Sequence, residues 1–125
     1  MPAILVVDDE PLIREMLMLV LERGGFAVIS AANGPQALSK YRLYKEDIEL
    51  VICDVAITGT GGLSLVKNLQ ADQPDLPIIL LSDHRDSMDL TSVSTLRFLP
   101  KPFDLFTLLS IVRSLISEGK TLPTM

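Results

Sequence analysis

Tryptophan is absent from this sequence, and histidine and cysteine each occur once among its 125 residues. The single cysteine, Cys53, excludes an internal disulfide and is consistent with a reducing compartment, so we expect a cytoplasmic protein. Because His84 is the only histidine, the chain has too few ligands for a zinc site of His and Cys residues. The same scarcity excludes a Ser or Cys nucleophile that a histidine and its partners activate.

Positive charge and long apolar runs are also scarce. Lys and Arg number 11 against 16 Asp and Glu, a formal net charge of −5, whereas a nucleic-acid surface needs a basic face. The longest apolar run, Met16–Leu21, is far shorter than the roughly 18 residues of a membrane helix. No basic segment precedes an apolar stretch at the N-terminus, so we expect no secretion signal. We therefore expect no nucleic-acid or membrane partner. We expect one domain over residues 1–125, with its core at about 3–118 and a short tail at 119–125.

What the chain does contain is a series of short apolar runs that alternate with helix-length segments. The runs are too short for buried helices and are rich in β-branched residues, which favours strands. The expected strands are Ala3–Val7, Phe26–Ala31, Leu50–Cys53, Ile78–Leu81 and Arg97–Leu99. The expected helices run from Pro11 to Arg23, from the Asn33-Gly34-Pro35 turn to about Lys45, through Leu65, Val66 and Leu69, and from an N-cap at Asp104 to Ser117.

Strands that are apolar throughout, alternating with amphipathic helices, indicate a parallel sheet that is covered on both faces. The sequence therefore predicts an α/β protein with a flavodoxin-like, doubly wound, five-stranded parallel sheet in the order 2-1-3-4-5. In such sheets ligands bind at the carboxyl ends of the strands. The residues that follow the strands are therefore the candidate site.

Polar side chains stand at four of these strand ends. Asp8 and Asp9 follow the first strand, Asp54 the third, Ser82 the fourth and Lys101 the fifth. Crowded carboxylates do not all ionise cheaply without a cation, and a small set of oxygen ligands suits Mg²⁺. The cation and the lysine would together neutralise a phosphoryl group, and the serine would donate to one of its oxygens. A single Asp at a strand end is usually a helix cap, but capping does not account for the whole set.

Other phosphate-binding sites fit this sequence poorly. A dinucleotide or flavin site needs glycines and free amides at the first turn, where this chain has Asp8-Asp9-Glu10-Pro11. The Gly59–Gly62 loop is not followed by Lys-Ser/Thr, so it is no Walker loop. Cys53 lies in an expected buried strand, which predicts an inert core thiol.

Four motifs in order carry a family resemblance that covers essentially the whole chain. They are Val6-Val7-Asp8-Asp9-Glu10, Ile52-Cys53-Asp54, Leu80-Leu81-Ser82 and Phe98-Leu99-Pro100-Lys101-Pro102-Phe103. With these motifs the chain resembles the CheY-like receiver domain of response regulators in two-component phosphorelay signalling. The resemblance implies a signalling phosphoacceptor that catalyses only its own phosphorylation and dephosphorylation, and is not a turnover enzyme.

The resemblance also implies a role for each site residue. Asp54 would accept a phosphoryl group from a phosphohistidine of a histidine kinase or histidine phosphotransfer domain. Asp8, Asp9 and Asp54, with the main-chain carbonyl of Ala56, would bind Mg²⁺.

The switch elements implied by the resemblance are the Ser82 hydroxyl, the Phe98 ring, the Lys101 ammonium and a cis bond from Lys101 to Pro102. The first helix would lie near the histidine-bearing partner, and the final helix near an output or homodimer contact. The residues expected to face the sheet are Ile13, Met16, Leu17 and Val20 on the first helix, and Leu105, Leu108, Leu109, Val112, Leu115 and Ile116 on the final helix. From apolar residues outside these inward stripes we expect Leu12 and Leu19 to contact the donor. Phe106 and Ile111 of the final helix are expected to belong to the output or homodimer surface.

This sequence departs from the family pattern in three places. Asp83 replaces the small residue that usually follows the switch hydroxyl, and Ile57-Thr58 stands where Met-Pro is common. The stretch from Ser82 to Lys101 is short and rich in Ser and Thr, which predicts a short or irregular fourth helix.

Two alternative functions stay open at this point. One is a receiver-like interaction module that binds a partner without phosphorylation. The other is a Mg²⁺-dependent phosphatase with Asp54 as nucleophile, although such chemistry needs a second acid two residues on, where Ala56 stands. The intact acidic and basic residues favour the phosphoacceptor over both.

Overall fold

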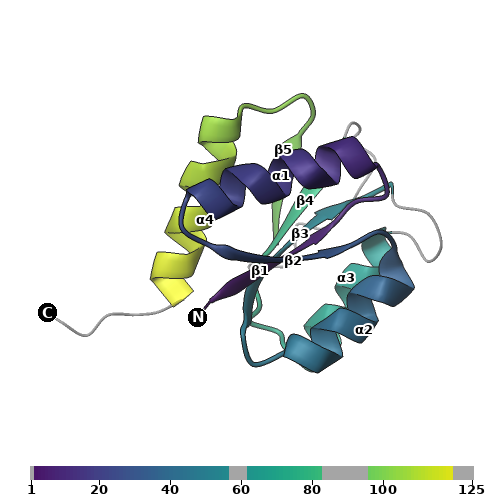
Figure 1. Cartoon of the computed structure of the whole chain (residues 1–125). Coiled ribbons are helices and arrows are strands. Elements are labelled where there is room, and N and C mark those ends of the chain that lie inside the picture. Colours follow the sequence, from purple (N-terminus) through teal and green to yellow (C-terminus); the bar gives the residue numbers. More distant parts are fainter. Residues whose placement is uncertain (1, 57–61, 83–95, 120–125) are drawn as a thin grey trace, which may run out of the picture.

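A computed structural model of the chain describes residues 2–56, 62–82 and 96–119. Its sheet has five parallel strands in the order β2-β1-β3-β4-β5, which confirms the predicted topology (Figure 1). The strands are β1 (Ala3–Val7), β2 (Ala27–Ala31), β3 (Ile48–Asp54), β4 (Ile78–Ser82) and β5 (Leu96–Pro100). The described helices are α1 (Pro11–Arg23), α2 (Gly34–Tyr44), α3 (Gly62–Asp72) and α4 (Leu105–Gly119).

The helices cover the sheet in pairs, α1 and α4 on one face and α2 and α3 on the other (Figure 1). Successive side chains of a strand point to opposite faces, so Ile4 and Val6 of β1 join the core beneath α1 and α4. Leu5 and Val7 join the core beneath α2 and α3. Because both faces are buried, β1 is apolar along its whole length.

Helix α1 follows the expected bounds but rotates its buried stripe. Leu17 and Leu21 are fully buried, whereas Met16, which was expected to face the core, is 37% exposed. At 3.6 residues a turn, Met16 lies about 100° around the helix from Leu17. The prediction for Met16 was wrong because Leu21 shares the inward face with Leu17 and shifts the centre of the stripe away from it.

Helix α4 buries a wider arc than its apolar pattern indicated. Leu108, Val112 and Leu115 are buried as expected, but Ile111, which was expected on an outer surface, is half-buried against the same core. The helix also approaches the end of α1, where a Cβ on Gly24 would lie 3.1 Å from Leu109 Cδ2. A helix that packs against both the sheet and a second helix buries residues outside a single apolar stripe.

Several sequence features lie outside the described residues. They are Ile57-Thr58, most of the Gly59–Gly62 loop, Asp83, the segment of the expected fourth helix at 83–95, and the tail beyond residue 119. Asp104, the expected N-cap, accepts a hydrogen bond from the Phe106 N–H at 3.0 Å. No helix within the described ranges is long and apolar enough to cross a membrane.

Candidate functional site

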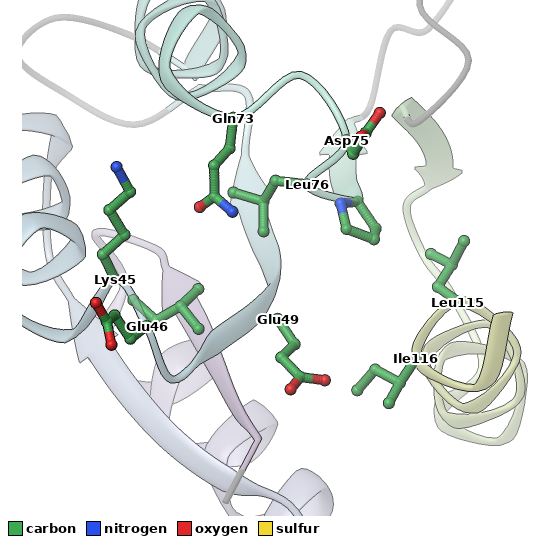
Figure 2. Close-up of a pocket in the computed structure, with 10 residues that line it drawn as sticks. Lys45, Glu46, Glu49, Gln73, Asp75, Leu76, Leu115 and Ile116 are labelled. Carbon is green, nitrogen blue, oxygen red and sulfur yellow. The ribbon is translucent and has the colours of Figure 1, made fainter. Parts of the chain in front are cut away.

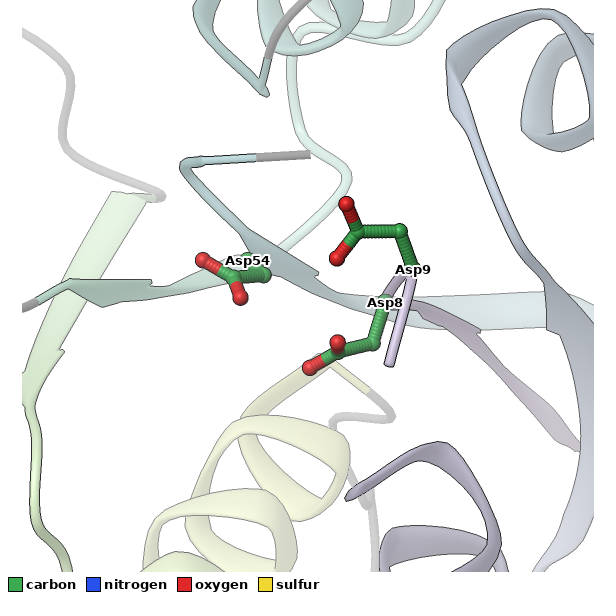
Figure 3. A group of neighbouring side chains, drawn as sticks. All are labelled: Asp8, Asp9 and Asp54. Atoms are coloured by element: carbon green, nitrogen blue, oxygen red, sulfur yellow. The ribbon is translucent and has the colours of Figure 1, made fainter. Parts of the chain in front are cut away.

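Three carboxylates meet where β1 and β3 end. Asp8 and Asp9 directly follow β1, and Asp54 is the last residue of β3 (Figure 3). Each offers an oxygen that lies within 4.8 Å of the other two. Asp8 is 0% exposed and Asp54 5% exposed, whereas Asp9 is half-buried. The structure therefore brings together the three acids that the sequence placed at the strand ends.

Main-chain donors orient two of these carboxylates. The Glu10 N–H donates to Asp8 Oδ1 at 2.9 Å, and the Ala56 N–H donates to Asp54 Oδ1 at 3.0 Å. The second oxygen of Asp8, Oδ2, is buried and has no hydrogen-bond partner among the described residues. A buried acceptor without a partner is costly, and a cationic ligand at this atom would remove that cost.

The electrostatics of Asp8 agree with a site built for a cation. Burial raises the pKa of Asp8 above its usual value, the Glu10 N–H opposes that rise, and the charge of Asp54 adds to it. A carboxylate that is expensive to ionise alone is stabilised by a positive partner. Oxygen donors in a compact group suit a hard divalent cation such as Mg²⁺.

Lys101 supplies a positive charge from the adjoining strand end. It follows β5, and its N–H donates to the Ser82 carbonyl at 3.0 Å, which ties the ends of β4 and β5 together. Its Nζ forms an ion pair with Asp54 Oδ2 at 2.8 Å. The peptide bond from Lys101 to Pro102 is cis, as expected. Asp54 therefore has one oxygen on a main-chain amide and the other on an ammonium group.

The remaining expected residues are placed less completely. Ser82 is buried at the end of β4, opposite Pro100 of β5. Phe98 pairs with Leu80 along β5, but its side chain lies outside the described residues. For Ala56 the structure gives the bond of its N–H, so the carbonyl ligand stays a prediction.

One residue of the site escaped the sequence analysis. Arg14, one turn into α1, donates from Nη1 to the main-chain carbonyl of Asp8 at 2.6 Å. A signal for it exists, because Pro11 stands three residues after Asp8 and has no N–H to offer that carbonyl. An arginine one turn further along the helix is within reach.

Cys53, next to Asp54, is a buried thiol, as expected from the sequence. It is fully buried in the core beneath α2 and α3, and burial raises the pKa of its thiol to about 12, with smaller contributions from Asp54 and Asp8. The thiolate is the reactive form of cysteine, so burial disfavours a nucleophilic role for this thiol.

A separate groove lies at the opposite end of the sheet. It has a volume of about 410 Å³ and is lined by charged side chains such as Lys45 and Glu49 and by apolar ones such as Leu76 and Leu115 (Figure 2). Ile48, the first residue of β3, also lines it, whereas Asp54 ends the same strand. Ligands of doubly wound sheets bind at the carboxyl ends of strands, which favours the acidic cluster over this groove.

Comparison with known proteins decides the family. The model of the response regulator receiver domain matches residues 4–113. The chain belongs to this family. The receiver domain is 34% identical over 116 residues to the transcriptional regulatory protein CseB of Streptomyces avermitilis, covering 90% of this chain and 48% of the relative. It is 32% identical over 123 residues to the DNA-binding response regulator MtrA of Mycolicibacterium smegmatis, covering 96% and 53%. The chain thus spans about half the length of these two relatives.

Solved receiver domains share the fold closely. The response regulator TrrA of Thermotoga maritima, in complex with Mg²⁺ and BeF, is 36% identical with a TM-score of 0.79, over 92% of this chain and 99% of that one. The receiver domain of the hybrid histidine kinase CckA is 30% identical with a TM-score of 0.80, over 92% and 99%. These matches confirm the predicted fold and the predicted class, a signalling phosphoacceptor domain of two-component systems.

Proposed function

We propose that Asp54 is the residue that accepts the phosphoryl group, from a phosphohistidine on a histidine kinase or histidine phosphotransfer domain. The observation that carries this assignment is the ion pair between Lys101 Nζ and Asp54 Oδ2 at 2.8 Å, formed beside two further carboxylates. A carboxylate that lies among other carboxylates and is paired with a lysine can contact both a bound cation and an incoming phosphoryl group.

Asp8, Asp9 and Asp54 would hold Mg²⁺, with the main-chain carbonyl of Ala56 as a further ligand. The buried, unpartnered Oδ2 of Asp8 supports this assignment, since it is an acceptor that the described protein groups leave unpaired. When bound, the cation supplies positive charge that offsets both the carboxylates and the incoming phosphoryl group.

In the transfer itself, a carboxylate oxygen of Asp54 forms a bond to phosphorus while the P–N bond to the donor histidine breaks. The electron pair of that bond leaves with the imidazole nitrogen, which takes up a proton from solvent. Phosphoryl transfer needs positioning and charge neutralisation more than covalent help from the protein. The chain would therefore catalyse its own phosphorylation, and the later hydrolysis that passes the phosphoryl group to water as inorganic phosphate, without acting as a turnover enzyme.

Lys101 and Ser82 would respond to the new charge. Before transfer the ammonium of Lys101 is held by Asp54, and afterwards the phosphoryl oxygens offer it a stronger partner. Ser82 stands on the neighbouring strand, and its carbonyl already accepts the Lys101 N–H. The two residues would move together, and Phe98 on β5 is proposed to turn inward with them.

The test is labelling with a small phosphodonor such as acetyl phosphate, followed by intact-mass analysis. We expect a gain of one phosphoryl group that requires Mg²⁺ and is absent from Asp54→Ala. Asp47→Asn, an exposed Asp before β3, is the matched control and should label normally. Phosphorylation of Asp54→Ala would refute the assignment, and an unlabelled parent protein would favour the interaction module.

Exposed apolar residues on α1 and α4 are candidates for the partner contacts. Leu12 and Leu19 on α1 are 79% and 51% exposed and are proposed to contact the histidine-bearing donor. Phe106 on α4 is 80% exposed and is proposed to belong to an output or homodimer surface. The proposal includes the cytoplasm as the compartment, since a single buried thiol is consistent with a reducing environment.

A further inference from the structure

In the turn between β1 and α1, the main-chain carbonyl of Asp8 lacks the main-chain donor that such a turn usually provides. In a turn that starts at Asp8, its carbonyl would accept an N–H from the third residue on. That residue is Pro11, which has no N–H. The first residue of the helix therefore offers this carbonyl no donor, and another group has to supply one.

Arg14 does so. Its Nη1 donates to the Asp8 carbonyl at 2.6 Å, and its own N–H is anchored by the Glu10 carbonyl at 3.0 Å. The arginine is half-buried between the helix and the turn. A hydrogen bond from a charged donor is stronger than one between neutral groups, so this contact is suited to hold the turn in one conformation.

The carbonyl in question belongs to the peptide that joins Asp8 to Asp9. Asp8 is held at two other points as well, since its N–H donates to the Ala31 carbonyl at 3.1 Å and its Oδ1 accepts the Glu10 N–H at 2.9 Å. The orientation of the shared peptide decides where the Asp9 carboxylate points relative to the buried Asp8. Holding that peptide in one orientation therefore fixes the Asp8 and Asp9 carboxylates relative to each other.

We propose that Arg14 is a positioning residue for the cation site, which orients the Asp8–Asp9 peptide so that both carboxylates face Asp54. This inference rests on the proposed function. The direction of the change in Mg²⁺ affinity when Arg14 is removed also distinguishes this role from a simple effect of charge. A guanidinium acting only through its charge would repel the cation, so its removal would tighten Mg²⁺ binding. Loss of a positioning bond weakens Mg²⁺ binding instead.

The test compares three variants of the full chain for Mg²⁺ binding by isothermal titration calorimetry, without any phosphodonor. Arg14→Met keeps the aliphatic stem and loses the donor, and we expect its Kd for Mg²⁺ to rise about tenfold, as for the loss of one charged hydrogen bond. Arg14→Lys keeps one donor and the charge and should lie between Arg14→Met and the parent. Arg23→Met removes the same charge from the exposed far end of α1 and should bind Mg²⁺ as the parent does.

Phosphorylation kinetics give a second measurement. We expect Arg14→Met to need more Mg²⁺ for half-maximal labelling by acetyl phosphate and to reach the parental rate at saturating Mg²⁺. A purely structural role would lower the melting temperature and leave the Mg²⁺ requirement unchanged.

Unchanged or tighter Mg²⁺ binding by Arg14→Met overturns the role of Arg14. If that variant does not fold, Arg14→Gln replaces it with the same expected weakening and the same refuting result. A parent that binds no Mg²⁺ removes the cation site and this inference together, whereas a parent that binds Mg²⁺ normally beside an unaffected Arg14→Met removes the inference alone.

Discussion

Replacing Asp8 with Asn should stabilise the metal-free protein while removing its response to Mg²⁺. Asp8 is fully buried, and its Oδ2 has no partner among the described residues. The amide of Asn keeps an oxygen for the Glu10 N–H. It also places a donor within reach of the neighbouring carboxylates, which lie within 4.8 Å. The substitution therefore removes a buried charge and leaves the local hydrogen bond intact.

The size of the effect follows from the cost of a buried polar atom that lacks a partner, about 1–3 kcal/mol. We take the lower part of that range and expect Asp8→Asn to raise the free energy of unfolding by about 1–2 kcal/mol in EDTA. Mg²⁺ at 100 times its Kd stabilises a binding-competent protein by about 2.7 kcal/mol. The order of stability should therefore reverse, with the parent the more stable protein in saturating Mg²⁺.

Urea unfolding followed by far-ultraviolet circular dichroism measures both quantities, because the chain has no tryptophan for fluorescence. Asp47→Asn makes the same chemical change at an exposed site and should match the parent in both buffers. A lower stability of Asp8→Asn in EDTA, or an undiminished stabilisation of that variant by Mg²⁺, would refute the reasoning.

The difference between Asp8→Asn and the parent should also depend on pH. Burial raises the pKa of Asp8 in the folded protein above the value of 3.8 for an exposed Asp, so the folded state binds that proton more tightly than the unfolded chain. The protonated carboxyl thus contributes stability that is fully present below about pH 4 and is lost as pH rises through the folded-state pKa. In EDTA the advantage of the Asn variant should be smallest near pH 4 and largest at neutral pH.

Four further outcomes are expected. Lys101→Ala should leave Mg²⁺ binding largely intact, measured by calorimetry, while abolishing the change in amide chemical shifts that phosphorylation causes on β5 and α4. Leu12→Ser with Leu19→Ser should slow transfer from the cognate phosphodonor several-fold, with labelling by acetyl phosphate unchanged. Phe106→Ser should reduce self-association measured by analytical ultracentrifugation. Gly25→Ala should cost about 1 kcal/mol in urea unfolding, because Gly25 has a φ of +97° that a Cβ disfavours.

The sequence predicted the sheet and the acidic cluster because both depend on local patterns. A β-branched apolar run such as Ala3–Val7 has few alternatives to a buried strand, and a doubly wound sheet places the residues after such strands at one edge. The exposure of Met16 and the burial of Ile111 were not predictable in the same way. They depend on how α1 and α4 contact each other as well as the sheet, and a single helical stripe contains no information about a second neighbour.

Arg14 was missed for a different reason. Its contact is made to a main-chain carbonyl, and sequence motifs describe side chains that meet one another. Arg14 could have been identified by matching each main-chain carbonyl to a donor, since every buried carbonyl needs one. Pro11 removes the nearest one from Asp8, which makes a long cationic side chain one turn later the natural replacement.

The signs of these effects also test the simplest competing explanation, that the strand-end acids are only helix caps. If Asp8 were only a cap, Asp8→Asn would change the stability little, because Asn caps a helix about as well as Asp does. A charge cluster behaves differently, because its members do not all contribute stability. Asp8 has a buried oxygen that no described group satisfies, so its neutralisation should stabilise the metal-free fold. Lys101 pairs with Asp54, so its removal should destabilise it by leaving a buried carboxylate unpaired. Stabilisation by Asp8→Asn is incompatible with capping alone, and opposite signs at Asp8 and Lys101 are expected of a charge cluster that binds a cation.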